Sequence, residues 1–275
     1  MLERDLAQFV PRLRLSLAIR DYVIKTAESA REVEQALRLR HEVFYRERLG
    51  YSRPDGLDVD RFDPICDHIL AVQMATGQVV GTYRLNPSPD HDCYSRQEFD
   101  ISSILRLEGK KLEIGRGCVR QSGRTRGVFM TLWAGIAEYM SRSGTRYAFG
   151  CLSMPASEDL GRVRALYGFL QTKHHSTGDC RVYPLNPLPG CPTAKRSPAG
   201  DEVMDEATSR RLLPLLSVYL HAGAVVCGEP AYDESFRTYD FFTLLDLQGV
   251  TSAGNRLFRT PDRGSFRTVR SFMKE

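Results

Sequence analysis

The residues with the clearest chemical potential lie in one stretch of the sequence, Lys111 to Tyr139. Its first part predicts a strand in which Glu113, Gly115 and Gly117 share one face, because side chains alternate along a strand. A carboxylate would then lie beside two positions where a ligand could contact bare backbone. A basic, glycine-containing loop and an apolar helix follow, and a helix N-terminus offers free N–H groups to a phosphate. The stretch therefore indicates an anion-binding groove that contains one acid or base.

Glu113 has two alternative roles. It could accept a proton from an incoming amine, directly or through a water, or it could only form ion pairs with Arg40, Arg84 or Arg116. A carboxylate paired with arginine has a lowered pKa and is a poor base. In a regular strand Glu113 and Arg116 point to opposite faces. A site shared by both would therefore require a β-bulge, which the neighbouring glycines allow.

Arg40 lies on the apolar stripe of a predicted helix, where a guanidinium must either extend to solvent or find a carboxylate. The acidic loop that follows contains Asp58, Asp60 and Asp63, but its spacing does not fit a calcium-binding loop. These carboxylates could be solvated or could face a cationic substrate. His68 could be a second proton acceptor or a structural hydrogen-bonding residue.

Length and composition indicate a globular protein of one large domain, with 275 residues of which 26% are charged. The seven cysteines are scattered and show no metal-ligand spacing, so we expect reduced cytoplasmic thiols and no metal site. Cys118 and Cys151 lie in apolar strand patterns and are predicted to be buried. Charges interrupt the apolar runs of the N-terminus, and no run reaches the ~20 residues that span a membrane, so we expect neither a signal peptide nor a transmembrane helix.

The end of the sequence is basic. Residues 249–275 hold six basic and two acidic residues, so this segment has a net charge of +4, equal to that of the whole chain. Apolar residues alternate with these charges, as in helices that lie on anionic lipid. A solvated basic terminus is the alternative. Nucleic acid is not expected, because no nucleic-acid-binding motif is present.

Hydrophobic periodicity predicts alternating strands and helices. The predicted strands cover residues 13–26, 69–75, 79–85, 145–152, 225–227 and 239–247, the predicted helices cover 28–49, 158–173 and 213–222, and a short amphipathic segment covers 99–107. We expect a core over 13–183, a proline-rich loop over 184–200, the C-terminal part of the same domain over 201–248 and a basic tail over 249–275.

Six short motifs occur in one order along the chain and together resemble the acyl-carrier-protein-dependent N-acyltransferases of the GNAT superfamily. Within that group, the sequence is most similar to the bacterial ornithine N-acyltransferases of ornithine lipid synthesis, once labelled hemolysin-like. The resemblance spans residues 13–247. The motifs are Arg40–Phe44, Asp58–Asp63, Cys66–His68, Val80–Arg84, Glu113–Arg116 and Leu132–Ile136.

The resemblance implies an α/β (α+β) fold, with a GNAT-like mixed twisted sheet flanked by helices and a C-terminal helix and strand extension. The related acyl-homoserine lactone synthases carry a tryptophan in the early loop, whereas the only tryptophan here is Trp133. The acetyl-CoA loop of the superfamily is also replaced by the arginine-rich segment Arg120–Gly127. The missing early tryptophan weakens the lactone synthase interpretation, and the arginine-rich segment favours acyl carrier protein over coenzyme A.

The implied reaction is direct transfer of a 3-hydroxy fatty acyl group from the phosphopantetheine of acyl carrier protein to the α-amine of ornithine, giving lyso-ornithine lipid without a bound cofactor or metal. The family's characteristic elements carry over to Arg40, Phe44, Asp60, Asp63, Arg84, Glu113 and Arg116. The full predicted site consists of catalytic Glu113, Arg40, Arg84, Arg116 and His68; substrate-binding Phe44, Asp58, Asp60, Asp63 and Phe99; acyl-phosphopantetheine-binding Gly115, Gly117, Cys118, Val119 and Gly123; and carrier-protein-binding Arg120, Arg124 and Arg126.

Three alternatives remain open at this point. The acceptor could be glycine, lysine or tyrosine, or the protein could be an acyl-homoserine lactone synthase. A protein of another class, a noncatalytic module that binds acyl carrier protein or anionic membrane, would also use the arginines. The expected location is the cytoplasm, including the inner face of the membrane through the basic tail.

Overall fold

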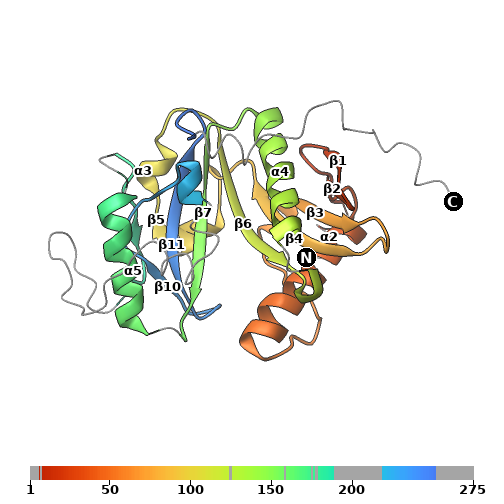
Figure 1. The fold of residues 1–275 in the computed structure, drawn as a ribbon, viewed down its shortest axis with the longest axis horizontal. Helices are drawn as coiled ribbons and strands as arrows, with labels where there is room; N and C mark the ends of the chain where they lie inside the picture. Colours follow the sequence, from red (N-terminus) through yellow and green to blue (C-terminus); the bar gives the residue numbers. More distant parts are fainter. Residues whose placement is uncertain are drawn as a thin grey trace. The chain divides into compact units, whose positions relative to one another are not determined.

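The computed structural model describes residues 6, 8–123, 126–157, 159–174, 176, 179–188 and 219–251 (Figure 1). These residues form two compact units, the first drawn from Met1–Pro87 and Leu112–Thr145 and the second from Ser88–Lys111 and Arg146–Asn255. Each unit is therefore built from separate stretches of the chain. Most of the predicted proline-rich loop and nearly all of the predicted basic tail lie outside the described residues.

The first unit contains an antiparallel sheet with the strand order β1-β2-β3-β4-β6. The single strand predicted over 13–26 is wrong, because the chain reverses at Arg20, whose φ is 54°. The strands predicted over 69–75 and 79–85 are confirmed as β3 and β4, which pair antiparallel with each other. The strands are β1 (Ser16–Ile19), β2 (Tyr22–Thr26), β3 (Asp67–Gln73), β4 (Val79–Asn86) and β6 (Lys111–Val119), of which the last begins at the edge of the unit.

Helix α2 (Ala30–Arg40) covers one face of this sheet. Its Val33 and Leu37 share a buried cluster with Leu70 of β3 and Cys118 of β6. The side chain of Ser29 caps the helix by accepting a hydrogen bond from the Glu32 N–H at 3.3 Å. The helix predicted over 28–49 is confirmed in extent, but its second half is a π-helical segment, η1 (His41–Leu49).

Helix α4 (Arg126–Ser143) covers the opposite face. A Cβ on Gly135 of this helix would overlap Ile24 of β2, and a Cβ on Gly81 of β4 would lie 2.8 Å from Leu132 of α4. The helix therefore approaches the sheet closely at two glycines. The apolar helix predicted after the basic loop is confirmed.

Strand β6 contains a β-bulge opposite β4. Thr82 pairs with Cys118 and Arg84 with Gly115, so β6 has one more residue than β4 in this interval. Within it, Arg116 has a φ of 51°, in the left-handed region that residues with side chains rarely adopt. The bulge that a shared site for Glu113 and Arg116 required is therefore present.

The bulge reverses the alternation of side chains along β6. Residues paired across strands point to the same face, so Glu113, Gly115 and Cys118 lie on the α2 face. A Cβ on Gly117 would instead overlap the ring of Tyr83, whose OH accepts a hydrogen bond from Trp133 of α4 at 3.4 Å. The predicted common face of Glu113, Gly115 and Gly117 is therefore wrong for Gly117, which lies on the α4 face.

The carboxylate of Asp67, at the start of β3, ties the N-terminal segment to α4. It accepts hydrogen bonds from the N–H groups of Arg12 at 2.9 Å and Leu13 at 3.0 Å, and from the hydroxyl of Tyr139 at 2.8 Å. These contacts fix the first residue of β3, directly after the acidic loop.

The second unit is built on β7 (Tyr147–Pro155) and β11 (Thr238–Asp246), which pair in antiparallel register over their full lengths. Apolar residues of α5 (Leu160–Lys173), including Leu166, pack with Phe241 on one face. On the other face Phe149 and Phe242 pack with Phe99. The remaining elements are β5 (Phe99–Asp100), α3 (Ser102–Leu105), β8 (Tyr183–Pro184), β9 (Val225–Val226) and β10 (Ala231–Asp233).

The later predicted elements agree with the second unit, except that β8 and β10 were not predicted. Residues 219–222 are helical and Gly223, with a φ of 105°, follows them as predicted, while 213–218 lie outside the described residues. In the part of the chain that the structure describes, no helix combines the length and the apolar character needed to cross a membrane.

The two glycines of β6 provide a matched test of the bulge. Replacing Gly117 by Ala forces a methyl group into the Tyr83 ring, and we expect this to lower the free energy of unfolding by about 1–3 kcal/mol. Gly115→Ala is the control, since a Cβ there meets nothing within 4 Å; its effect should stay below about 1 kcal/mol. Urea unfolding measures both. Equal losses in the two variants would contradict the assigned faces.

Candidate functional site

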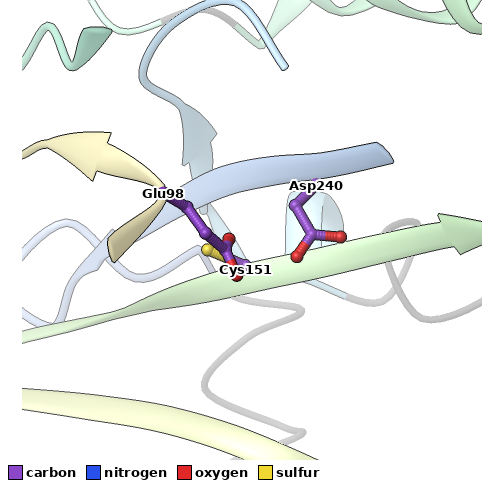
Figure 2. A group of neighbouring side chains, drawn as sticks. All are labelled: Glu98, Cys151 and Asp240. Atoms are coloured by element: carbon purple, nitrogen blue, oxygen red, sulfur yellow. The ribbon is translucent and has the colours of Figure 1, made fainter. Parts of the chain in front are cut away.

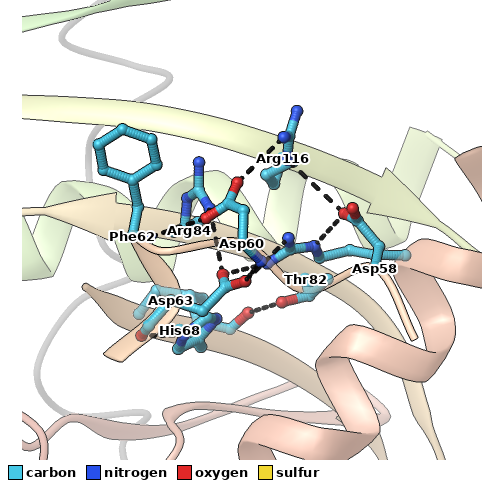
Figure 3. Close-up of polar contacts among 10 residues, drawn as sticks. Asp58, Asp60, Phe62, Asp63, His68, Thr82, Arg84 and Arg116 are labelled. Carbon is cyan, nitrogen blue, oxygen red and sulfur yellow. Dashed lines mark hydrogen bonds and ion pairs between the residues drawn. The ribbon is translucent and has the colours of Figure 1, made fainter. Parts of the chain in front are cut away.

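Three arginines and three aspartates of the first unit form ion pairs on the α2 face of the sheet, and Figure 3 labels all of them except Arg40. Arg40 is the last residue of α2, Arg84 lies on β4 and Arg116 is in the bulge of β6. The aspartates come from the acidic loop before β3, which includes the short 3-10 helix η2 (Asp63–Ile65). Residues that are far apart in the sequence are thus brought together by one helix end, two strands and one loop.

Arg40 is the most deeply buried of these side chains. Its exposed fraction is 0%, and it pairs through Nε with Asp58 Oδ2 at 2.7 Å and through Nη1 with Asp63 Oδ1 at 2.7 Å. The structure therefore decides between the two alternatives for Arg40, extension to solvent and pairing with a carboxylate. Arg40 binds carboxylates and does not extend to solvent.

The other two arginines complete a closed arrangement. Arg84 Nη1 lies 2.6 Å from Asp60 Oδ1 and 3.1 Å from Asp63 Oδ1. Arg116 lies 3.1 Å from Asp60 Oδ2 through Nη2 and 3.6 Å from Asp58 Oδ2 through Nε. Each aspartate bridges two arginines. The six residues form a ring of alternating charge, the ion ring: Arg40, Asp58, Arg116, Asp60, Arg84 and Asp63.

The surroundings of the ring favour the charged form of its members. Burial acts to raise the pKa of Asp63, but Arg40 and Arg84 outweigh it and hold the pKa far below the usual range. Burial likewise acts to lower the pKa of Arg84, and Asp63 and Asp60 outweigh it, so that this pKa is raised. The pKa of Asp60 is also lowered, because Arg84 and Arg116 outweigh the effect of its burial.

The acidic loop is held in shape by its own backbone. The N–H of Asp60 donates to Asp63 Oδ2 at 2.8 Å, and the N–H of Phe62 donates to Asp60 Oδ1 at 2.9 Å. The Phe62 ring contacts two guanidinium groups, Arg61 at 4.7 Å and Arg84 at 5.5 Å from its centroid. The carboxylates are therefore pre-positioned for the arginines.

His68 lies beneath the ring with no exposed surface. Its Nε2 is 3.1 Å from the carbonyl oxygen of Asp63, so Nε2 carries the hydrogen and donates it. Burial lowers the pKa of His68 to about 4, so the imidazole is neutral at pH 7. This position supports the loop and gives no direct access to a substrate; the predicted role in proton transfer stays untested.

Asp60 and Arg116, neighbours in the ring, are its most exposed members. The side chain of Asp60 is 23% exposed and that of Arg116 is 11% exposed, whereas Asp58 and Asp63 are at 3% and 0%. Asp60 and Arg116 thus present one negative and one positive charge side by side. Direct substrate binding by Asp58 and Asp63 stays a prediction, and their carboxylates already bind arginines.

Glu113 and Gly115 lie on the same sheet face as the ring. Glu113 is opposite Asn86 and Gly115 is opposite Arg84. The side chain of Glu113 is almost fully buried, while the space beside Gly115 is open. An acid or base and a stretch of bare backbone therefore occur on one face, although at Gly115 alone and not at both glycines.

The structure places the remaining predicted residues in different surroundings. Phe99 belongs to the second unit, where it is 1% exposed and packs against Phe242 with ring centroids 5.7 Å apart. The side chain of Phe99 is therefore part of a core, and its substrate-binding role stays a prediction. Phe44 packs against the cluster around α2 and thereby holds η1 in position. Cys118 is buried in the same cluster, as predicted for its thiol.

The segment after β6 is described in part. Val119 ends the strand opposite Gly81. The N–H of Arg120 donates to the Val80 carbonyl at 2.8 Å, and its one-third-exposed side chain pairs with Glu42 at 3.2 Å. Gly123 ends the short 3-10 helix η4 (Gln121–Gly123). Arg124 and the side chain of Arg126 lie outside the described residues, so their predicted contacts with a carrier protein are not tested.

Comparison with known proteins gives one consistent result. Residues 39–134, which contain the whole ion ring, match the family model described as an acetyltransferase (GNAT) domain. The L-ornithine N(alpha)-acyltransferase of Brucella abortus (strain 2308) is 30% identical over 254 residues, covering 83% of this chain and 85% of the relative. That of Rhodobacter capsulatus is 31% identical over 267 residues, covering 88% and 97%.

Solved structures resemble the chain more distantly. FeeM, an N-acyl amino acid synthase from uncultured soil microbes, is 9% identical with a TM-score of 0.47, over 82% of this chain and 92% of that one. BjaI, a CoA-dependent acyl-homoserine lactone synthase, is 19% identical with a TM-score of 0.45, over 82% and 81%.

Breaking the ring should be far more costly than breaking a surface ion pair. Asp63→Asn leaves Arg40 and Arg84 buried with less compensating charge, and we expect a loss of about 3–5 kcal/mol in the free energy of unfolding. Glu34→Gln is the control, because it breaks an exposed pair with Arg38 and should cost less than about 1 kcal/mol. Urea unfolding compares them. Similar losses would mean that the ring does not stabilise the fold.

Proposed function

This chain belongs to the L-ornithine N(alpha)-acyltransferase family and is an N-acyltransferase of GNAT type, and we propose that it acylates ornithine with a 3-hydroxy fatty acyl group from acyl carrier protein. The product would be lyso-ornithine lipid. The names of the relatives support ornithine as the acceptor. The acyl carrier protein and the 3-hydroxyl group rest on the resemblance of the sequence.

The observation that carries the proposal is the bulge of β6. It brings Glu113, Gly115 and Arg116 to one sheet face, so that a carboxylate, an open stretch of backbone and a guanidinium are adjacent. A thioester can lie along Gly115 because no side chain fills that space. The amine that attacks it would then be beside Glu113.

The reaction requires one proton acceptor. The α-amine of an amino acid is protonated at neutral pH, since its pKa is ~8 or above. Glu113 would take one proton, and the free amine nitrogen would attack the thioester carbonyl carbon, where backbone N–H groups near Val119 would stabilise the oxyanion. The C–N bond forms, the C–S bond breaks, and the thiolate leaves with the second amine proton. The products are an amide and free phosphopantetheine thiol.

Asp60 and Arg116 would recognise the acceptor. Their exposed edges present opposite charges, and ornithine carries a cationic side chain and an α-carboxylate. Asp60 would bind the side-chain ammonium and Arg116 the carboxylate. The buried members, Arg40, Asp58, Asp63 and Arg84, would hold these two groups in place.

The donor would bind beyond β6. Arg120, one-third exposed at the end of the strand, and the arginines that follow it in sequence would attract the acidic carrier protein. Such contacts mainly raise the association rate and weaken with salt. The phosphopantetheine would arrive with its carrier protein, so no resident cofactor is proposed. The reaction would take place in the cytoplasm or, through the basic tail, on the inner membrane face.

Product analysis tests the proposal directly. The purified protein is incubated with 3-hydroxyacyl carrier protein and an equimolar pool of ornithine, lysine, glycine and tyrosine, and the products are identified by mass spectrometry. We expect N-acyl ornithine to be the main product, with one thiol released for each amide formed. The reaction should be slower when acyl-CoA is the donor. A dominant product on another amino acid would reject the acceptor. Absence of thiol release with every amine would reject the reaction and favour a binding module.

Glu113→Gln tests the proton acceptor. The amide keeps the size of the side chain but cannot accept the proton, so kcat should fall by about 10²–10⁴-fold. The control is Glu138→Gln, a partly exposed position that pairs with Arg142 on α4. Near-wild-type kcat in a folded Glu113→Gln protein would remove Glu113 as the base.

A further inference from the structure

A second buried polar cluster lies in the second unit and takes no part in the proposed reaction. Glu98, Cys151 and Asp240 point toward one another (Figure 2). One carboxylate oxygen of each acid and the Sγ of Cys151 all lie within 4.8 Å of one another. No sequence pattern indicated this group, because its members are far apart in the chain.

The sheet places two of the three side chains. Cys151 on β7 is paired with Phe242 on β11, and Asp240 is paired with Ser153, two residues after Cys151. Cys151 and Asp240 are therefore diagonal neighbours on one face. Glu98 reaches the same face, because the next residue, Phe99, packs against Phe242.

Among the described residues, the carboxylates of this cluster lack the arginine partners that neutralise the carboxylates of the ion ring. Glu98 is 7% exposed, and neither of its oxygens has a hydrogen-bond partner in the part of the chain that the structure describes. Asp240 is 3% exposed, and its Oδ1 has no partner within the same residues. Buried acceptors of this kind are rare in native proteins and call for a proton, a water or an ion.

A third carboxylate makes the local charge more negative. Asp233 accepts a hydrogen bond from the hydroxyl of Tyr94 at 3.1 Å. Burial, followed by the charges of Asp240 and Asp233, raises the pKa of Glu98 well above its usual range. Burial also raises the pKa of Asp240. The geometry itself places two buried carboxylates within 4.8 Å of one another with unpaired oxygens among the described residues, an arrangement that a bound cation would stabilise.

The ligand set indicates the class of cation. Mg²⁺ and Ca²⁺ prefer six or more oxygen ligands, whereas a thiolate selects softer ions such as Zn²⁺. We propose that Glu98, Cys151 and Asp240 form a binding site for a divalent cation of the zinc class, with a fourth coordination position left for water or another donor. Binding displaces the thiol proton and the protons held by the carboxyl groups, and these are released to solvent.

Cobalt titration tests the site independently of enzyme activity. The full-length protein is stripped with a chelator and titrated with Co²⁺, whose bond to a thiolate gives a charge-transfer absorption in the near ultraviolet. We expect saturation at one Co²⁺ per chain and displacement by Zn²⁺. Thermal unfolding measured with and without Zn²⁺ should show a higher Tm with the metal, since only the folded chain binds it tightly.

Substitutions assign the ligands. Cys151→Ser should abolish the charge-transfer band and the rise in Tm. Glu98→Gln and Asp240→Asn should weaken binding at least as much as the roughly 10–100-fold that is typical when a supporting group is lost. Cys180→Ser is the control, because it removes another partly buried thiol packed against the same core cluster and should change neither measurement.

Two results would overturn the proposal. One is a stripped wild-type protein that gives no saturable cobalt band; the carboxylates would then share a proton. The other is a band that persists in Cys151→Ser, which would place the metal elsewhere. If Glu98→Gln and Asp240→Asn fail to fold, the comparison of Cys151→Ser with Cys180→Ser still tests the proposal. A half-buried thiol tolerates replacement by serine.

Discussion

The first unit depends on one constraint, the neutralisation of charge within the ion ring. Moving a charged side chain out of water costs several kcal/mol even after relaxation, and a pair repays this only with short, well-directed contacts. The ring meets that condition by giving each carboxylate two guanidinium partners. Because the arginines come from α2, β4 and β6, the acidic loop can close only on a sheet whose strands are already in register.

The bulge of β6 is part of the same constraint. Without the extra residue, Arg116 would point to the α4 face and Asp58 and Asp60 would each lose one cation. The left-handed backbone of Arg116 is strained, and the ion pairs offset that strain. The bulge also explains the different surroundings of the two glycines. Gly115 stays on the open side, while Gly117 turns under Tyr83.

Local patterns predicted much of the fold and less of the site. Most strands and the helices α2, α4 and α5 follow from periodicity, because each buries one apolar face. The bulge also followed from the sequence, since Glu113 and Arg116 could share a site in no other way. The reversal at Arg20 was missed, because no glycine or proline marks it. The burial of Phe99 was missed as well, since an apolar side chain suits a core and a pocket equally.

The pairings of the ring could not be predicted for a different reason. Arg40 offered a choice between solvent and a carboxylate, and its choice of Asp58 and Asp63 depends on a loop that folds back over the helix end. Such contacts join positions far apart in sequence, whereas periodicity reports only on neighbours. The motifs indicated that these residues matter. They did not indicate that the aspartates bind the protein's own arginines.

The two buried acidic clusters show two ways to hold carboxylates in a protein interior. In the ion ring three arginines supply the positive charge, and the pKa of Asp63 is lowered. Around Glu98 no oxygen is bound by a cation among the described residues, and the pKa is raised. Burial is similar in both clusters, so the opposite directions come from the partners. A side chain with a raised pKa keeps its proton until a stronger positive charge replaces it, and a thiol at the same place makes a zinc-class ion a suitable replacement.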